Sequence, residues 1–278
     1  GGIAVAGFFF FSGFLITKSR KSLPVGRFFW HRMLRIFPAI WLALLLVAFV
    51  IAPLGWIKDK GSIAGYWSAD VDSPFTYVFQ NMFLMLDQRN IAEMGDSLPY
   101  AVVTGGGADQ NGSAWTLQYE FKAYVMVGLV CLLGWAASRY VLTAIGITII
   151  VLNGLLWSGH IQPATWFGGS LADIGGHAFL ADPYNFMLLS PYAFGMLLAC
   201  WSDKVPVTWW LALIGLVGGV YSFTHGNWNA FGQFGIMYVF MWSAVRMRWL
   251  FPWERKFGDL SYGTYILAWP LMQLACYY

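Results

Sequence analysis

The chain has 278 residues, of which 59% are hydrophobic and only 10% are charged, with a formal net charge of +3. Soluble globular domains carry about 25% charged residues, so this composition excludes an ordinary soluble enzyme and indicates a polytopic membrane protein. The near balance of basic and acidic residues gives no reason to expect a nucleic-acid partner. We expect an all-α fold, a transmembrane helix bundle that accounts for residues 1–278 as a single domain.

Apolar stretches long enough to cross a bilayer recur along the chain, where a span needs about 20 mostly apolar residues. The sequence predicts about eight such helices: residues 1–17, 36–57, 115–137, 140–158, 186–202, 205–223, 230–247 and 259–278. The stretch YVFQNMFLML (77–86) is too short to cross, and we expect it to be interfacial or re-entrant.

The order of charges at the N-terminal end is the reverse of a signal peptide. Lys18, Arg20 and Lys21 follow the first apolar stretch instead of preceding it. This is typical of a helix that runs from outside to inside. We therefore expect a fragment that lacks the first membrane helix and also the last, from a bundle of about ten spans.

Basic residues set the expected orientation through the positive-inside rule. If the first helix ends in the cytoplasm, only Lys58, Lys60 and Arg89 of the basic residues lie outside, and Lys122 lies within a span. The sequence thus predicts a multi-pass protein of the cytoplasmic (inner) membrane. Residues 18–35 form a cytoplasmic loop, and residues 58–114 form an extracytoplasmic loop or cap.

Basic side chains are concentrated in GRFFWHRMLRIFPAIW (26–41), which contains Arg27, His31, Arg32 and Arg35. They are either the charged edge of a helix, bound to lipid headgroups, or a site for an anionic ligand. Arg32 and Arg35 share a helical face, and guanidinium groups bind phosphate bidentately. Pro38 predicts a helix start near residue 37, which would place the pair at a helix N-terminus, where phosphate is favoured. These features favour a bound polyphosphate.

Three motifs of this chain resemble those of the acyltransferase-3 family of integral membrane acyltransferases. The first is FFFFSGFLI (8–16), with Ser12 and Gly13, followed after a basic loop by FFWHRMLRIFPAIW (28–41). The second is NGSAWTLQYEFKAY (111–124), with Trp115 and Glu120. The third is FGDLSYGTYILAWPLMQ (257–273), with Tyr262 and Tyr265, for which we expect a packing role.

The resemblance implies transfer of an acyl group, commonly acetyl from acetyl-CoA, to a hydroxyl of a sugar or cell-surface glycan. It implies that Arg32 and Arg35, with Arg27 nearby, contact the phosphates of acyl-CoA, which is a co-substrate and not a bound cofactor. No metal site is expected. The family's catalytic base is implied to be a His on the first membrane helix, which would precede Gly1. Neither the acceptor nor the oligomeric state follows from the sequence.

Glu120 is a carboxylate inside an expected membrane helix, where a charge is costly and normally functional. The alternative is a structural pairing with Lys122, an Arg or a Tyr hydroxyl. The resemblance gives it the family's acidic position, so we expect it to orient the base or hold the acceptor hydroxyl. Ser113 is expected to cap this helix.

The remaining polar and thiol groups give weaker signals. The histidines are expected to be interfacial or solvated; they are His31, His160, His177 and His225, of which His177 near Asp173 is the best candidate for chemistry. The cysteines are expected to be small buried hydrophobes; they are Cys131, Cys200 and Cys276. Sugar stacking on Trp115, Tyr66 or Trp67 is a minor alternative to packing.

Two other functions stay open at this stage. A transporter or flippase of a glycan or lipid-linked substrate would also use a helix bundle and an intramembrane Glu, although no internal repeat is visible. A structural scaffold would leave the Arg pair and Glu120 unexplained.

Overall fold

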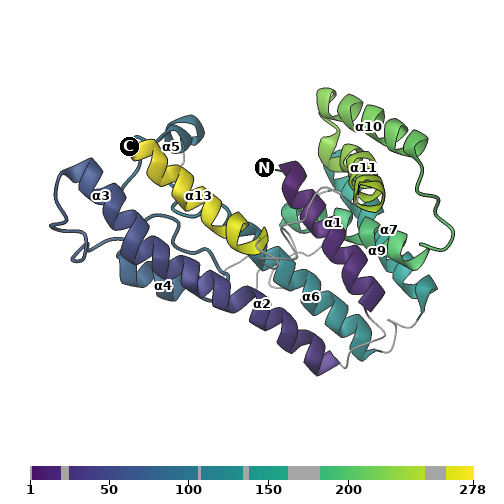
Figure 1. Cartoon of the computed structure of the whole chain (residues 1–278), viewed down its shortest axis with the longest axis horizontal. Coiled ribbons are helices and arrows are strands. Elements are labelled where there is room, and N and C mark those ends of the chain that lie inside the picture. Colours follow the sequence, from purple (N-terminus) through teal and green to yellow (C-terminus); the bar gives the residue numbers. More distant parts are fainter. Residues whose placement is uncertain (1, 20–24, 106–107, 134–137, 162–181, 248–260) are drawn as a thin grey trace. The chain divides into compact units, whose positions relative to one another are not determined.

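The structure is a computed structural model, and it describes all residues except 1, 20–24, 106–107, 134–137, 162–181 and 248–260 (Figure 1). Every regular element among the described residues is a helix, as the composition predicts. The chain divides into two compact units. Unit 1 comprises Gly1–Phe28 and Tyr119–Phe251, and unit 2 comprises Phe29–Gln118 and Pro252–Tyr278.

Most helices of unit 1 correspond to expected spans. They are α1 (Gly2–Ser19), α6 (Leu117–Leu132, of which the first two residues belong to unit 2), α7 (Arg139–Trp157), α9 (Pro183–Cys200), α10 (Trp209–Thr224), the π-helical turn η5 (Trp228–Gly232) and α11 (Gln233–Arg246). Unit 2 is built mainly from α2 (Val25–Leu46, whose first turn belongs to unit 1), the π-helical turn η1 (Val47–Ile51), α3 (Ala52–Lys60), α4 (Pro74–Asn81), α5 (Pro99–Thr104), the 3-10 turn η2 (Ala114–Thr116) and α13 (Ser261–Tyr277).

In the part of the chain that the structure describes, three helices are long and apolar enough to cross a membrane: Gly2–Ser19, Gly26–Lys60 and Arg139–Trp157. Tyr184–Cys200 and Trp209–Thr224 are shorter apolar helices. The other expected spans, 115–137, 230–247 and 259–278, also contain helices, namely α6, α11 and α13. The chain is therefore an integral membrane protein by the length and composition of its helices.

Two glycines allow α1 and α9 to cross at backbone contact. A Cβ built on Gly13 would lie 2.0 Å from the carbonyl oxygen of Tyr192, and one built on Gly195 would lie 2.0 Å from that of Phe10. Small residues are enriched where membrane helices pack closely, because helices in lipid associate through packing and not through the hydrophobic effect. The glycine of the SGFL motif is thus required by the packing of unit 1.

Neighbouring helices of unit 1 are oriented by polar contacts at their ends. Lys18 donates to the Ser202 hydroxyl, so the C-terminal ends of α1 and α9 lie together. Trp201 donates to Thr143 near the start of α7, so α7 runs antiparallel to α9. Arg246 at the end of α11 donates to the Val207 carbonyl just before α10, so these two are antiparallel as well. These directions match the alternation expected of successive spans.

Unit 2 is organised on one long helical run formed by α2, η1 and α3. Its 35 residues from Gly26 to Lys60 measure about 52 Å at 1.5 Å per residue. The predicted helix start near residue 37 is wrong, because Pro38 lies inside α2. Proline removes one backbone hydrogen bond but does not force a chain end, and membrane helices tolerate it.

The expected loop or cap at 58–114 folds back along this helix. The Tyr66 hydroxyl donates to the Ala48 carbonyl in the π-helical turn (2.6 Å), and Trp67 stacks on Phe49 with ring centroids 5.9 Å apart. Nearer the start of the helical run, in α2, Trp41 Nε1 donates to the Met82 carbonyl at 3.0 Å. The stretch 77–86 therefore lies against the helix well before its end, which favours the re-entrant alternative.

Helix α13 runs parallel to the long helix in Figure 1. Its first turn meets α2, where the Tyr262 hydroxyl donates to the Ile36 carbonyl at 3.4 Å. Its last turn meets α3, where a Cβ on Gly55 would lie 2.9 Å from the Tyr277 ring. Cys276 on this helix is exposed, so the expectation that it is buried is wrong, whereas Cys200 in α9 is buried. The Cys131 side chain is outside the described residues.

Candidate functional site

Arg32 and Arg35 lie in the interior of α2. Both side chains are half-buried, whereas Arg27 and His31 are exposed. The helix begins at Val25, so Arg32 and Arg35 are not next to the free N–H groups and the positive dipole of a helix N-terminus. The prediction that the pair lies at a helix N-terminus is wrong. Their spacing on one uninterrupted helix does place the two guanidinium groups on a common face.

The third motif lies against the first. Tyr262, at the start of α13, donates to the carbonyl of Ile36, the residue that follows Arg35. Ile36 is fully buried, so this contact joins two elements that are 226 residues apart inside the core of unit 2. Tyr262 therefore contacts the turn of α2 that carries the Arg pair.

The third motif also packs against the second. Trp269 Nε1 donates to the Asp109 carbonyl at 2.7 Å, and the Tyr265 and Thr116 hydroxyls are 2.8 Å apart. A Cβ on Gly112 would lie only 2.6 Å from the Trp269 ring, so only glycine fits there. All three sequence motifs thus contribute residues to unit 2, and α13 connects them.

Glu120 is buried in α6, with 2% of its surface exposed. Its Oε1 accepts a hydrogen bond from Tyr124, one turn further along the helix, which is one of the pairings that the structural alternative named. Lys122 donates instead to the Asn185 side chain at 3.0 Å and lies 4.7 Å from the centre of the Tyr119 ring. Ser113 makes no side-chain capping bond, so its predicted capping role is wrong.

The other residues named from the sequence are dispersed. His31 and His225 are exposed, and His160 contacts the Ser158 hydroxyl on the surface. Ser12 and Trp115 are half-buried. His177 and Asp173 lie outside the described residues. Among the residues that are described, no three His, Cys, Asp or Glu side chains are grouped so as to hold a metal ion.

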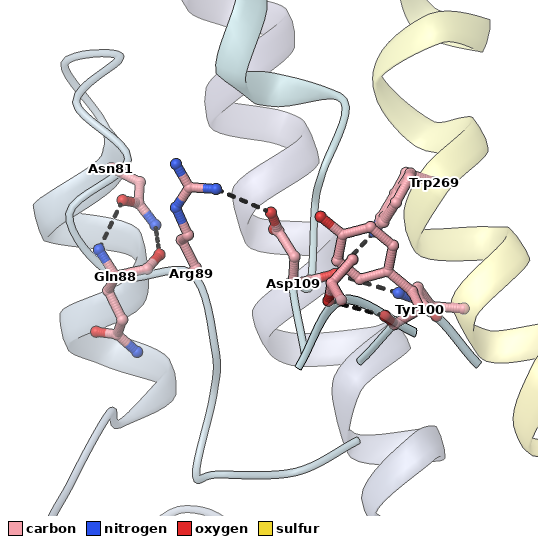
Figure 2. A network of polar contacts seen from close by, with 8 residues as sticks. Asn81, Gln88, Arg89, Tyr100, Asp109 and Trp269 are labelled. Carbon is pink, nitrogen blue, oxygen red and sulfur yellow. Dashed lines mark hydrogen bonds and ion pairs between the residues drawn. The ribbon is translucent and has the colours of Figure 1, made fainter. Parts of the chain in front are cut away.

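A network of polar side chains in unit 2 was not predicted from the sequence (Figure 2). Asn81 donates to the Gln88 carbonyl at 2.7 Å and accepts from the Gln88 N–H. The Arg89 guanidinium lies 3.5 Å from the carboxylate of Asp109. Beside them, the Tyr100 ring meets the Trp269 ring edge-on, with centroids 4.7 Å apart.

The carboxyl group of Asp109 is the chemically distinctive member of this network. Its side chain is largely buried, whereas that of Arg89 is 61% exposed. Burial raises the pKa of Asp109 above its ordinary value, and the nearby Arg89 charge only partly offsets that effect. The one available signal in the sequence was the run of amide and acidic residues between 81 and 111, which does not reveal which of them meet.

Comparison with known proteins accounts for the three motifs. A family profile described as an acyltransferase domain matches residues 1–278. An O-acetyl transferase of Shigella phage Sf6 is 35% identical over 130 residues, which are 46% of this chain and 34% of that protein. Nodulation protein 10 of Rhizobium leguminosarum bv. viciae is 25% identical over 219 residues, 75% of this chain and 55% of that protein.

The chain therefore spans about a third and about half of the length of these two relatives. No solved structure matches it. The family profile covers the whole chain and includes the Arg pair, the Glu120 segment and the Tyr262 segment. The protein belongs to the acyltransferase-3 family of membrane acyltransferases.

Proposed function

We propose that the protein is a membrane O-acyltransferase that moves an acyl group, acetyl by default, from acyl-CoA to a hydroxyl of a sugar or glycan. The observation that carries this proposal is the family match over residues 1–278, together with a relative named as an O-acetyl transferase. In the reaction, the acceptor oxygen bonds to the thioester carbonyl carbon and the carbon–sulfur bond breaks. The hydroxyl proton passes to a general base, and the departing thiolate of coenzyme A takes up a proton.

The donor is proposed to bind at the cytoplasmic end of α2. Arg32 and Arg35 present two guanidinium groups on one helical face, and both are half-buried, so a phosphate there would be partly shielded from water. Arg27 is exposed and adds positive charge on the approach. Tyr262 supports this role by holding the backbone beside Arg35 in place.

Glu120 is proposed to hold the acceptor hydroxyl or to orient the general base. Its burial in an apolar helix supports this role, because an ionisable group there is costly unless it is used. The contact with Tyr124 restricts the carboxylate to one orientation, as a positioning role requires.

The donor site is tested by measuring acetyl-CoA binding to the full-length protein in detergent. Each guanidinium–phosphate contact contributes about 1.5–3 kcal/mol, so changing both Arg32 and Arg35 to Ala should weaken binding at least about 100-fold. Arg139→Ala is the control, because it also removes a partly exposed arginine side chain but lies in unit 1. Equal affinity in all three proteins would remove the Arg pair from the donor site.

Transport or flipping of a glycan is the second candidate, and the buried Glu120 and the partly buried Lys122 in one apolar helix favour it. Release of coenzyme A that depends on an added sugar acceptor supports acyl transfer. Movement of the glycan across vesicles without coenzyme A release supports transport. Glu120→Gln should lower kcat for coenzyme A release while leaving acetyl-CoA affinity unchanged.

A further inference from the structure

Asn111 is a buried amide whose hydrogen-bonding capacity is unused. Its residue is 1% exposed, and among the described residues neither Nδ2 nor Oδ1 has a hydrogen-bond partner. An amide removed from water without a partner is costly, and buried polar groups in native proteins are nearly always paired.

The two polar residues that precede Asn111 in the chain both have partners. Gln110 donates to the Asn90 side chain at 3.1 Å, and the Asp109 carboxylate meets Arg89. Asn81, the other fully buried asparagine of unit 2, has both ends of its amide bonded to the backbone of Gln88. Folding of unit 2 therefore satisfies Asn81 and leaves Asn111 unsatisfied.

The immediate surroundings of Asn111 combine a carboxylate with aromatic rings. Asp109 lies two residues before it, and its backbone carbonyl accepts from Trp269. Gly112, the next residue, packs directly on the Trp269 ring. Tyr100 and Trp269 are only partly buried and Arg89 is mostly exposed, so this edge of the network meets solvent beside the buried Asn111 and Asp109.

The unpaired amide of Asn111 and the nearby carboxylate of Asp109 indicate which kind of ligand they could bind. An amide offers one acceptor oxygen and two donor hydrogens, and a carboxylate accepts only. A hydroxyl both donates and accepts, so neighbouring hydroxyls on a ring can bond to the amide and the carboxylate together. Aromatic rings next to such polar groups provide the apolar surface on which the face of a sugar ring packs.

We propose that Asn111 and Asp109, beside Trp269, form the subsite that binds a hydroxyl-bearing ring of the acceptor, which is a carbohydrate. This inference rests on the proposed O-acyltransferase function and names residues that select its acceptor. A site built to hydrogen-bond hydroxyls rejects ligands that lack them, so Asn111 sets specificity and takes no part in the chemistry.

The test uses the full-length protein in detergent and compares Asn111→Leu with Asn81→Leu. Thermal unfolding is recorded without ligand and with millimolar methyl glycosides of glucose, galactose, mannose, rhamnose and N-acetylglucosamine as probes. Asn111→Leu removes two unpaired buried groups, so its midpoint should equal or exceed that of the native protein, whereas Asn81→Leu should unfold at a lower temperature. At least one glycoside should raise the midpoint of the native protein and of Asn81→Leu, but not that of Asn111→Leu.

Steady-state kinetics provide the second measurement. With the glycoside that binds, Asn111→Leu should raise the KM for the acceptor at least about tenfold and leave the KM for acetyl-CoA unchanged. If leucine prevents folding, Asn111→Ala gives the same comparison.

Equal glycoside responses in native protein and Asn111→Leu, or no response in either, would overturn the inference and leave a buried water as the partner of Asn111. Glycoside binding without coenzyme A release would instead refute the proposed function and leave this subsite intact. The two failures are therefore distinguishable.

Discussion

Replacing Gly13 with alanine tests whether this motif glycine serves packing or chemistry. The new methyl group would lie 2.0 Å from the carbonyl oxygen of Tyr192, where ordinary contacts begin at 3.4 Å, so α1 and α9 must move apart by about 1.4 Å. The obstructing atom belongs to the backbone and cannot rotate away. Overpacking costs about 1–3 kcal/mol. Alanine in a helix returns about 0.5–1 kcal/mol relative to glycine, so we expect a net loss of about 1 kcal/mol.

The assay is denaturant-induced unfolding of the full-length protein in detergent, followed by circular dichroism. Gly218→Ala in α10 is the matched control, because nothing lies within 4 Å of the added methyl group, and it should stabilise by about 0.5–1 kcal/mol. Gly195→Ala should resemble Gly13→Ala, and the double variant should cost less than the two together, since one separation of the helices accommodates both methyl groups. A Gly13→Ala protein with native stability but no acyl transfer would refute the packing role.

Two further predictions concern unit 2. Tyr66→Phe removes the hydroxyl that donates to the Ala48 carbonyl and should lower the free energy of unfolding by about 1 kcal/mol. Tyr140→Phe is the control, because that side chain is 66% exposed, and it should leave the free energy of unfolding unchanged. Equal effects of the two substitutions would show that the contact in the π-helical turn is not stabilising. Because burial raises the pKa of Asp109 in the folded state, the native protein should lose stability as pH rises from the ordinary carboxyl value through the raised one. Asp109→Asn should remove this loss, so the unfolding midpoint of the variant should rise relative to that of the native protein as the pH increases through that window. If the variant's midpoint instead rises relative to the native one as the pH is lowered, the ion pair with Arg89 outweighs burial.

Helix positions were predictable here because lipid imposes a length and a composition on any helix that crosses it. The stretches 1–17 and 140–158 are helical almost to the residue in α1 and α7. The start of α2 was not predictable from Pro38, since proline marks both helix starts and kinks within membrane helices, and the apolar residues on either side of it are compatible with both. The resemblance to a family, carried by short motifs, identified the protein more reliably than any single residue did.

The contacts of the candidate site were much harder to foresee. Arg89 meets Asp109 across 20 residues, and Trp269 meets Asp109 across 160, and neither pairing leaves a periodic signal in the sequence. Asn111 was visible as part of a motif, but its burial was not visible in the sequence. For Glu120, helical spacing excludes a pairing with Lys122 two residues away and allows one with Tyr124 four residues away.

The bond from Tyr262 to Ile36 has a consequence for biosynthesis. Unit 2 is discontinuous in sequence: its first part leaves the ribosome before the whole of Tyr119–Phe251, and α13 is made only after that segment. During that interval the α2 surface destined for α13 must remain in the bilayer without its native neighbour, and closing so large a loop is entropically slow. Ribosome-stalled chains that end before residue 261 and carry Ile36→Cys should therefore react with a cysteine-reactive label at that position, and synthesis of α13 should abolish that reactivity.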